Sequence, residues 1–120
     1  MTLEELYYKM IKEYGLETDE WGRSHIPGDN NKFLKLDGWL LTYGLTMHGN
    51  PYISVAQTIS CKYIKYASYV NFVRFIKMDD NTEKILRMYI ETTIRRYKKI
   101  MMRLKNDYEQ EKLNQVQEDF

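Results

Sequence analysis

The feature that most constrains this fold is a long C-terminal stretch, residues 81–120, that contains neither glycine nor proline. Asp80, as the cap residue, and Glu83, three residues later, form a variant of the capping box, and both carboxylates suit the positive end of a helix dipole. We therefore predict one long helix over 80–118. Its end, from about residue 106, is polar and acidic.

The long helix also carries an apolar seam with alternating spacings of four and three residues, which is a heptad pattern. Such a seam packs either on the rest of this chain or on a copy of itself. A homodimer through the long helix is therefore one of two expectations. The seam residues are Ile90, Ile94, Tyr97, Met101, Leu104 and Tyr108.

Charge is distributed unevenly along this helix. Residues 82–105 hold eight basic and two acidic side chains, whereas residues 106–120 hold one basic and five acidic. A helix this basic can neutralise several phosphates of DNA or RNA, and its binding would weaken steeply with salt. The alternative is a solvated helix whose long basic side chains cover core residues. The candidate contacts are Arg95, Arg96, Lys98, Lys99 and Arg103.

Length and composition bound the other possibilities. The chain of 120 residues is expected to form one domain, 1–120, and its net charge is only +1. The single cysteine, Cys61, excludes an internal disulfide and fits a reducing, cytoplasmic location. We expect no signal peptide and no membrane association. Few alanines and many tyrosines, lysines and asparagines are typical of AT-rich genes of bacteria, phages or plasmids.

The N-terminal part predicts a helix followed by a loop. Apolar residues repeat at three and four over 3–14, behind a capping box, and Gly15 stands where helices end in a left-handed residue. Residues 16–31 are rich in Gly, Pro, Asp and Asn and are predicted to be a loop. We expect Trp21 in this loop to fold back over the core, although long loops are often functional.

The middle of the chain predicts further helices. Residues 33–48 carry a helical apolar repeat, but the turn signal Asp37-Gly38 also allows a hairpin near 33–43. Residues 52–62 and 66–77 are interpreted as two more helices. The predicted fold is therefore all-α, with four to five helices, and the alternative is α+β with one small hairpin.

The helices predicted over 52–62 and 66–77 loosely resemble a DNA-binding helix-turn-helix, although Ile64 replaces the glycine expected in its turn. On the exposed stripe of the second helix, Asn71 could pair with adenine and Arg74 with guanine. The alternative is two core helices with a solvated polar stripe. Phosphate contacts would come from Lys62, Lys65 and Lys77.

Sequence motifs of enzymes are missing. The chain has no glycine-rich phosphate loop, no cysteine pair and no His-Glu-x-x-His. The spacing of His25, His48 and Cys61 matches no metal site. We therefore expect a non-enzymatic binding protein that needs neither cofactor nor metal.

Three functions remain, the third being a structural oligomer. The first is a small regulator that binds DNA or RNA through the basic helix and the helix-turn-helix-like pair. The second is an inhibitor or adaptor that binds a host protein, such as a nucleic-acid-processing enzyme, through the same basic helix or through its tyrosine-rich surface.

Overall fold

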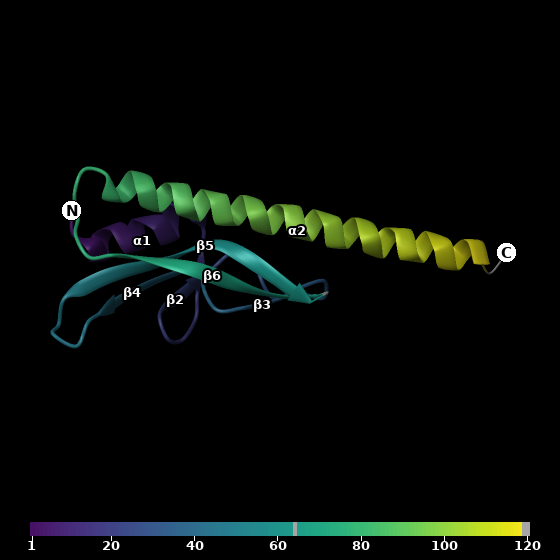
Figure 1. Cartoon of the computed structure of the whole chain (residues 1–120), viewed down its shortest axis with the longest axis horizontal. Coiled ribbons are helices and arrows are strands. Elements are labelled where there is room, and N and C mark those ends of the chain that lie inside the picture. The colour runs from purple at the N-terminus through teal and green to yellow at the C-terminus, as the bar shows by residue number, and fades with distance from the viewer. Residues whose placement is uncertain (64, 119–120) are drawn as a thin grey trace.

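The computed structural model describes residues 1–63 and 65–118, and this part of the chain forms an α+β fold (Figure 1). Two helices flank six strands along the chain. The elements are α1 (Leu3–Tyr14), β1 (Glu17–Thr18), β2 (Arg23–His25), β3 (Lys35–Asp37), β4 (Leu41–Leu45), β5 (Pro51–Tyr63), β6 (Tyr66–Phe75) and α2 (Thr82–Glu118).

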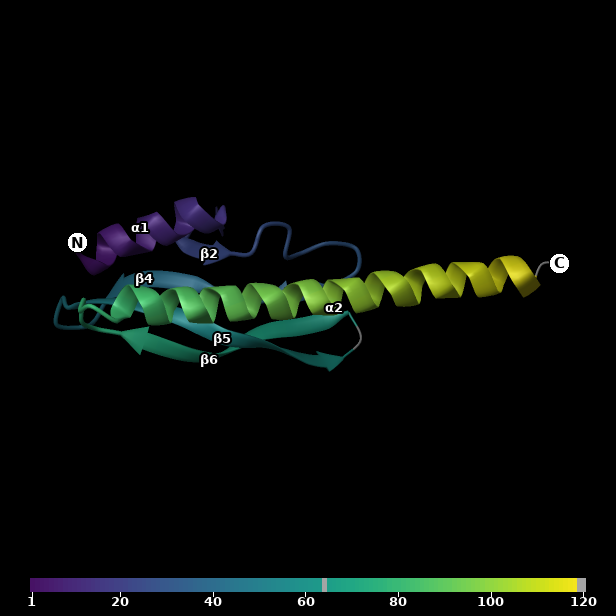
Figure 2. The same cartoon turned by 90° about the horizontal axis from the view of Figure 1, so that it is seen from above.

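The six strands form one mixed sheet in the order β1-β2-β4-β5-β6-β3. All neighbours are antiparallel except β3, which runs parallel to β6. Both helices lie over the same face of the sheet, with α2 packed along β5 and α1 beside it over β4 and β5 (Figures 1 and 2). Within residues 1–63 and 65–118, no helix covers the opposite face.

The prediction of an all-α fold is wrong, because the segments 52–62 and 66–77 form the long hairpin β5–β6. Both are rich in β-branched and aromatic residues, which favour a pleated surface over a helix. The hairpin turn contains no glycine. Lys65 instead takes the left-handed conformation there, with φ of 72°, so the usual sequence signal of a turn is missing.

The segment 33–48 is neither the predicted helix nor the alternative hairpin. It contains two strands, β3 and β4, that do not pair with each other, because β5 and β6 lie between them in the sheet. The Gly38 turn, with φ of 90°, therefore redirects the chain between distant strands instead of closing a hairpin. Leu40, directly before β4, bonds to the strands on both sides of it: its N–H donates to the carbonyl of Ser24 in β2, and its carbonyl accepts from the N–H of Ala56 in β5.

The N-terminal helix is present as predicted. The Thr2 hydroxyl accepts the Glu5 N–H at 3.1 Å, and Gly15 ends the helix with φ of 61°. The segment 16–31 is not wholly loop, since it contains the short strands β1 and β2.

The long helix expected over 80–118 is present as α2, and its start is organised by Asp79 rather than Asp80. The Asp79 carboxylate accepts from the N–H groups of Asn81 (2.9 Å) and Thr82 (3.1 Å). These bonds lower the pKa of Asp79. Beyond the sheet, α2 projects as a free arm, and the molecule is 66 Å long and only 26 Å wide (Figure 1). In the described residues, no helix combines the length and apolarity that a membrane crossing requires.

The core lies between the sheet and the two helices. Leu86 and Ile90 of α2 are completely buried against it, as are Leu6 and Met10 of α1. A buried hydroxyl also joins helix and sheet, because Thr93 donates to the carbonyl of Ala56 at 2.9 Å.

Candidate functional site

A large groove opens where α2 leaves the sheet. It lies between α2, the tip of the β5–β6 hairpin and the segment 32–34 (this site is called the basic groove below). Its volume of about 1180 Å³ exceeds the roughly 300–1,000 Å³ typical of small-molecule pockets. The size fits an extended ligand better than a metabolite.

Basic side chains from three separate segments converge on the basic groove. Six basic residues line it against two acidic ones, Asp107 and Glu111, which gives a local charge of +4. In the described part of the chain, none of the six takes part in an ion pair. Their charges are therefore available to an anionic ligand. The six are Lys32, Lys62, Lys65, Arg96, Lys99 and Arg103.

Aromatic rings lie among these charges. Tyr63 and Tyr66 are direct register partners at the hairpin tip and are 76% and 53% exposed. On the other wall Phe33 meets Tyr108 edge to face, with 5.5 Å between ring centroids. The Lys32 ammonium lies 5.0 Å from the Phe33 centroid. Exposed rings beside cations can hold a ligand with both flat and anionic parts.

The loop that carries Lys32 and Phe33 is fixed by side chains of its own and of α2. Asn31 accepts from the N–H groups of Phe33 (2.9 Å) and Leu34 (3.1 Å). The Tyr97 hydroxyl of α2 donates to the carbonyl of Gly28 at 2.9 Å. This wall of the groove is therefore pre-formed and bonded to α2.

A buried polar cluster anchors the preceding loop. The Tyr69 hydroxyl donates to Asp29 at 3.0 Å and accepts the N–H of Ile26 at 3.1 Å. The two ring nitrogens of His25 lie 3.1 Å from Asp29 and 3.0 Å from Asp19. His25 thus links two carboxylates on either side of β2.

The two carboxylates of this cluster have opposite pKa shifts. Burial raises the pKa of Asp29, with hydrogen bonds from Tyr69 and His25 acting against that shift. Desolvation would also raise the pKa of Asp19, but bonds from His25 and from Arg23 outweigh it and hold the pKa below its usual range. None of the side chains of this cluster lines the basic groove, and their bonds fix the loop that leads to it.

The predicted candidates separate into two groups. Half of the ten predicted contact residues line the basic groove, and they come from the hairpin tip and from α2. The five that line it are Lys62, Lys65, Arg96, Lys99 and Arg103. The side chain of Arg96 is also tied to the sheet, with its Nε 3.5 Å from the carbonyl of Ile59.

The other predicted contact residues lie elsewhere. Lys98 is exposed but does not line the basic groove, and Arg95 lines a different pocket of α2. The helix-turn-helix prediction is wrong, because Asn71 and Arg74 lie on strand β6 and no recognition helix carries them; Lys77 follows that strand. The Arg74 guanidinium lies 4.1 Å from the Tyr52 ring centroid.

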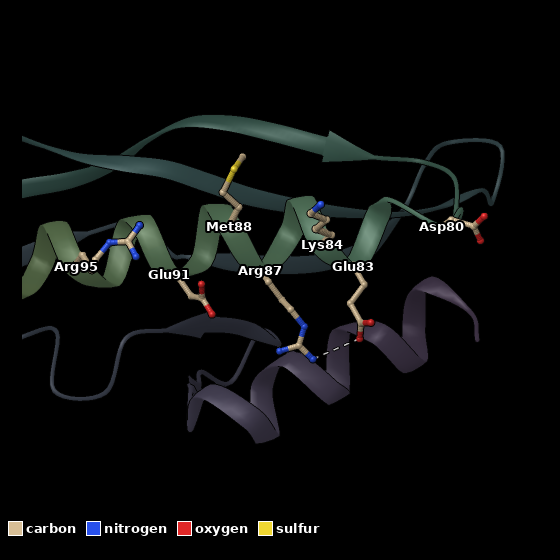
Figure 3. Close-up of a pocket in the computed structure, with 7 residues that line it drawn as sticks. All are labelled: Asp80, Glu83, Lys84, Arg87, Met88, Glu91 and Arg95. Carbon is tan, nitrogen blue, oxygen red and sulfur yellow. Dashed lines mark hydrogen bonds and ion pairs between the residues drawn. The ribbon is translucent and has the colours of Figure 1, made fainter.

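The pocket that includes Arg95 lies along the first turns of α2 (Figure 3) and is balanced in charge, with three basic and three acidic residues. Arg87 points from it toward α1, where it pairs with Glu13, and it also meets Glu83 at 3.4 Å. Lys9 pairs with Glu83 at 2.7 Å. These pairs lower the pKa of Glu13 and of Glu83 and hold the two helices together.

The heptad seam faces this chain's own sheet. Ile90 and Met101 are buried, and Ile94, Tyr97 and Leu104 pack partly buried against the core. Tyr108, at the end of the seam, lies on the wall of the basic groove. The seam therefore serves intramolecular packing along most of its length.

Several residues of the groove were not among the sequence candidates. Lys32 and Phe33 come from a loop whose position depends on the tertiary fold, and nothing near them in the sequence marks them. Tyr63 and Tyr66 do have a signal, since a lysine–tyrosine pair occurs twice within residues 62–66. Cys61, expected in the core by its type, is exposed at the groove.

Trp21 is not a lid over the core but is 70% exposed. The Arg23 guanidinium lies between two rings, 4.8 Å from the centroid of Trp21 and 4.5 Å from that of Trp39. Trp39 in turn contacts Phe72, with centroids 5.9 Å apart. These four side chains form an aromatic and cationic stack.

Comparison of the chain with protein-family models, with curated proteins and with solved structures finds no match. The functional argument therefore rests on the geometry and charge of the basic groove.

Proposed function

We propose that this protein binds nucleic acid, DNA or RNA, in the basic groove. The observation that carries the proposal is the convergence of six cations, drawn from the loop at 32, the hairpin tip and α2, around exposed aromatic rings; among the described residues none of the six has an ion-pair partner. A nucleic acid supplies both matching features, since it has regularly spaced phosphates and flat bases.

The proposed binding depends on backbone charge more than on base identity. In the described residues, Asn71 and Arg74 lie on strand β6, so no recognition helix presents these two side chains to base edges in a major groove. Lysine and arginine contacts to phosphate are independent of sequence. We therefore propose a sequence-tolerant nucleic-acid binder, located in the cytoplasm and regulatory through occupancy of its target.

Titration of labelled oligonucleotides by fluorescence anisotropy tests this function. Binding should be measurable at about 50 mM salt and should weaken steeply as salt rises. If all six cations contact phosphates of a single strand, log K should fall with log salt at a slope of roughly −4. Absence of binding to both single-stranded and duplex probes at about 50 mM salt would refute the proposal.

A second candidate function is capture of a protein partner, and the stack of Trp21, Arg23, Trp39 and Phe72 favours it. Tryptophan and arginine are the residue types that dominate binding energy at protein interfaces. In this case, affinity capture from a bacterial lysate would retain a protein after nuclease treatment, and Trp39→Ala would abolish the capture. Capture that disappears with nuclease would support the nucleic-acid proposal instead.

A further inference from the structure

We infer that the hairpin tip makes the basic groove selective for single strands, with Tyr63 and Tyr66 stacking on unpaired bases while the surrounding cations hold the phosphates. The inference rests on the proposed function and specifies its ligand class. It concerns strands whose bases are accessible, whether DNA or RNA.

The two tyrosines are presented as a pair. Tyr63 of β5 and Tyr66 of β6 are register partners, and side chains of directly paired residues lie on the same face of a hairpin, with Cβ atoms about 4.5–5.5 Å apart. Both line the basic groove. Two rings side by side at one rim offer a platform about the size of two bases.

These two rings are largely exposed, at 76% for Tyr63 and 53% for Tyr66. In the described part of the chain, neither Tyr63 nor Tyr66 packs against another aromatic ring or lies under a cation. Tyr108 on the opposite wall differs, because it contacts the ring of Phe33 and the ammonium of Lys112. The hairpin tyrosines thus expose ring surface without any role in packing the core.

The cations are placed to follow a strand past this platform. On the hairpin each tyrosine directly follows a lysine in the sequence, Tyr63 after Lys62 and Tyr66 after Lys65. On the opposite wall Arg96, Lys99 and Arg103 repeat at three and four along one side of α2, and seven residues of helix rise about 10 Å. That length matches about three phosphates of a stacked strand at roughly 3.4 Å each.

A duplex cannot use this arrangement fully. Its bases are stacked on one another, so it offers base edges in its grooves but no free base faces except at its ends. A single strand can turn its bases onto aromatic side chains, and such stacking is tolerant of sequence. The groove should therefore bind a single strand more tightly than a duplex of the same sequence.

The experiment compares three probes of about 12 nucleotides, within the site sizes known for single-strand binders. They are a mixed-sequence single strand, its blunt duplex and an abasic strand of equal length and charge, and the single strand is made as DNA and as RNA. Each is titrated at about 100 mM salt with wild type, with the double variants Tyr63→Leu/Tyr66→Leu and Tyr63→Phe/Tyr66→Phe, and with Tyr8→Leu. Tyr8 is an equally exposed tyrosine on α1 and serves as the matched control.

Wild type should bind the base-containing single strand about a hundredfold more tightly than the abasic strand, at about tenfold per ring, and at least tenfold more tightly than the duplex. The double leucine variant should lose about tenfold per ring, or roughly a hundredfold, on the base-containing strand only. Its salt slope should stay unchanged because no phosphate contact is removed. The double phenylalanine variant and Tyr8→Leu should behave like wild type, and circular dichroism should show the same fold for all.

Equal affinity for the single strand, the duplex and the abasic strand would overturn the inference but leave the proposed function intact. An equal loss in the leucine and phenylalanine variants would overturn it as well, since the phenylalanine rings still stack. Absence of binding to every probe would overturn the proposed function itself. A preference for the RNA or the DNA form of the strand would identify the natural source of this shared chemistry.

Discussion

At the scale of single residues, the hydroxyl of Tyr69 stands out because it makes two hydrogen bonds in a buried site. The Tyr69 hydroxyl is buried, donates to Asp29 and accepts from the N–H of Ile26. Removal of the hydroxyl leaves the Ile26 N–H without this acceptor and Asp29 without this donor, although His25 still contacts Asp29. We predict that Tyr69→Phe lowers the free energy of unfolding at pH 7 by about 1–3 kcal/mol, measured by urea denaturation, whereas Tyr8→Phe, on the exposed face of α1, changes it little.

The effect of Tyr69→Phe should depend on pH through Asp29, whose pKa is raised by burial and lowered by the Tyr69 bond. A carboxyl group with a raised folded-state pKa contributes stability that is full below its unfolded pKa and lost as pH rises through the folded pKa. Losing the hydroxyl raises that pKa further. The destabilisation should therefore be larger at pH 7 than below about pH 4, where Asp29 is protonated in both states; a pH-independent difference would contradict this.

At the scale of elements, α2 is held on the sheet by one buried face, to which Leu86, Ile90, Thr93, Ile100 and Met101 belong. Ile90 has no exposed surface and sits above β5 in the main core. We predict that Ile90→Ala costs about 2–5 kcal/mol of stability. Met102→Ala, on the same helix but 64% exposed, should stay within about 0.5 kcal/mol of wild type. Equal midpoints for both variants in urea would show that α2 does not pack as described.

The helices could be predicted from sequence because their signals are local. The Thr2 cap, Gly15 and the uninterrupted run after Asp80 mark α1 and α2 within a few residues. The central hairpin could not be predicted from sequence, because its turn uses Lys65 in a left-handed conformation and β6 also contains Asn71 with φ of 59°. Because neither glycine nor proline stands at these positions, the spacing of apolar residues in the two neighbouring strands also fitted two helices.

The site was predictable only in part, for a related reason. The sequence shows which residues of α2 are basic. It does not show which of them line one site together, because that depends on which face of α2 is turned toward the groove. Arg96 and Lys99 line the groove, while their neighbours Arg95 and Lys98 do not. The opposite wall of the groove is in place because β3 pairs in parallel with β6, and these two strands lie about 30 residues apart in the sequence. No local pattern encodes such a contact.

At the scale of the whole molecule, charge changes sign along the projecting arm. The basic groove ends at Asp107 and Glu111, after which α2 extends away from the sheet (Figure 1). These carboxylates should repel a polyanion that occupies the groove. We predict that Asp107→Asn/Glu111→Gln raises affinity for a single-stranded probe several-fold at about 50 mM salt, and that the gain shrinks at high salt. Lower affinity would mean that the ligand does not reach this end.

The seam of α2 faces the sheet of its own chain, so this surface is already used within one molecule. We therefore expect the protein to be monomeric at micromolar concentrations and its unfolding midpoint to be independent of concentration. The elements therefore have different roles. The sheet and α1 hold α2 in place, and α2 supplies one wall of the groove.

The most direct test of the central claim compares two triple variants of α2, each of which removes three positive charges from a different side of the helix. The groove variant is Arg96→Gln/Lys99→Gln/Arg103→Gln, and the control is Lys84→Gln/Arg95→Gln/Lys98→Gln, which changes net charge equally outside the groove. Anisotropy titrations with a single-stranded probe measure affinity and salt slope. We predict that the groove variant binds at least a hundredfold more weakly at about 100 mM salt, with a slope less negative by about 2, while the control stays within about threefold of wild type. Equal losses in both variants, or none in the groove variant, would contradict the account.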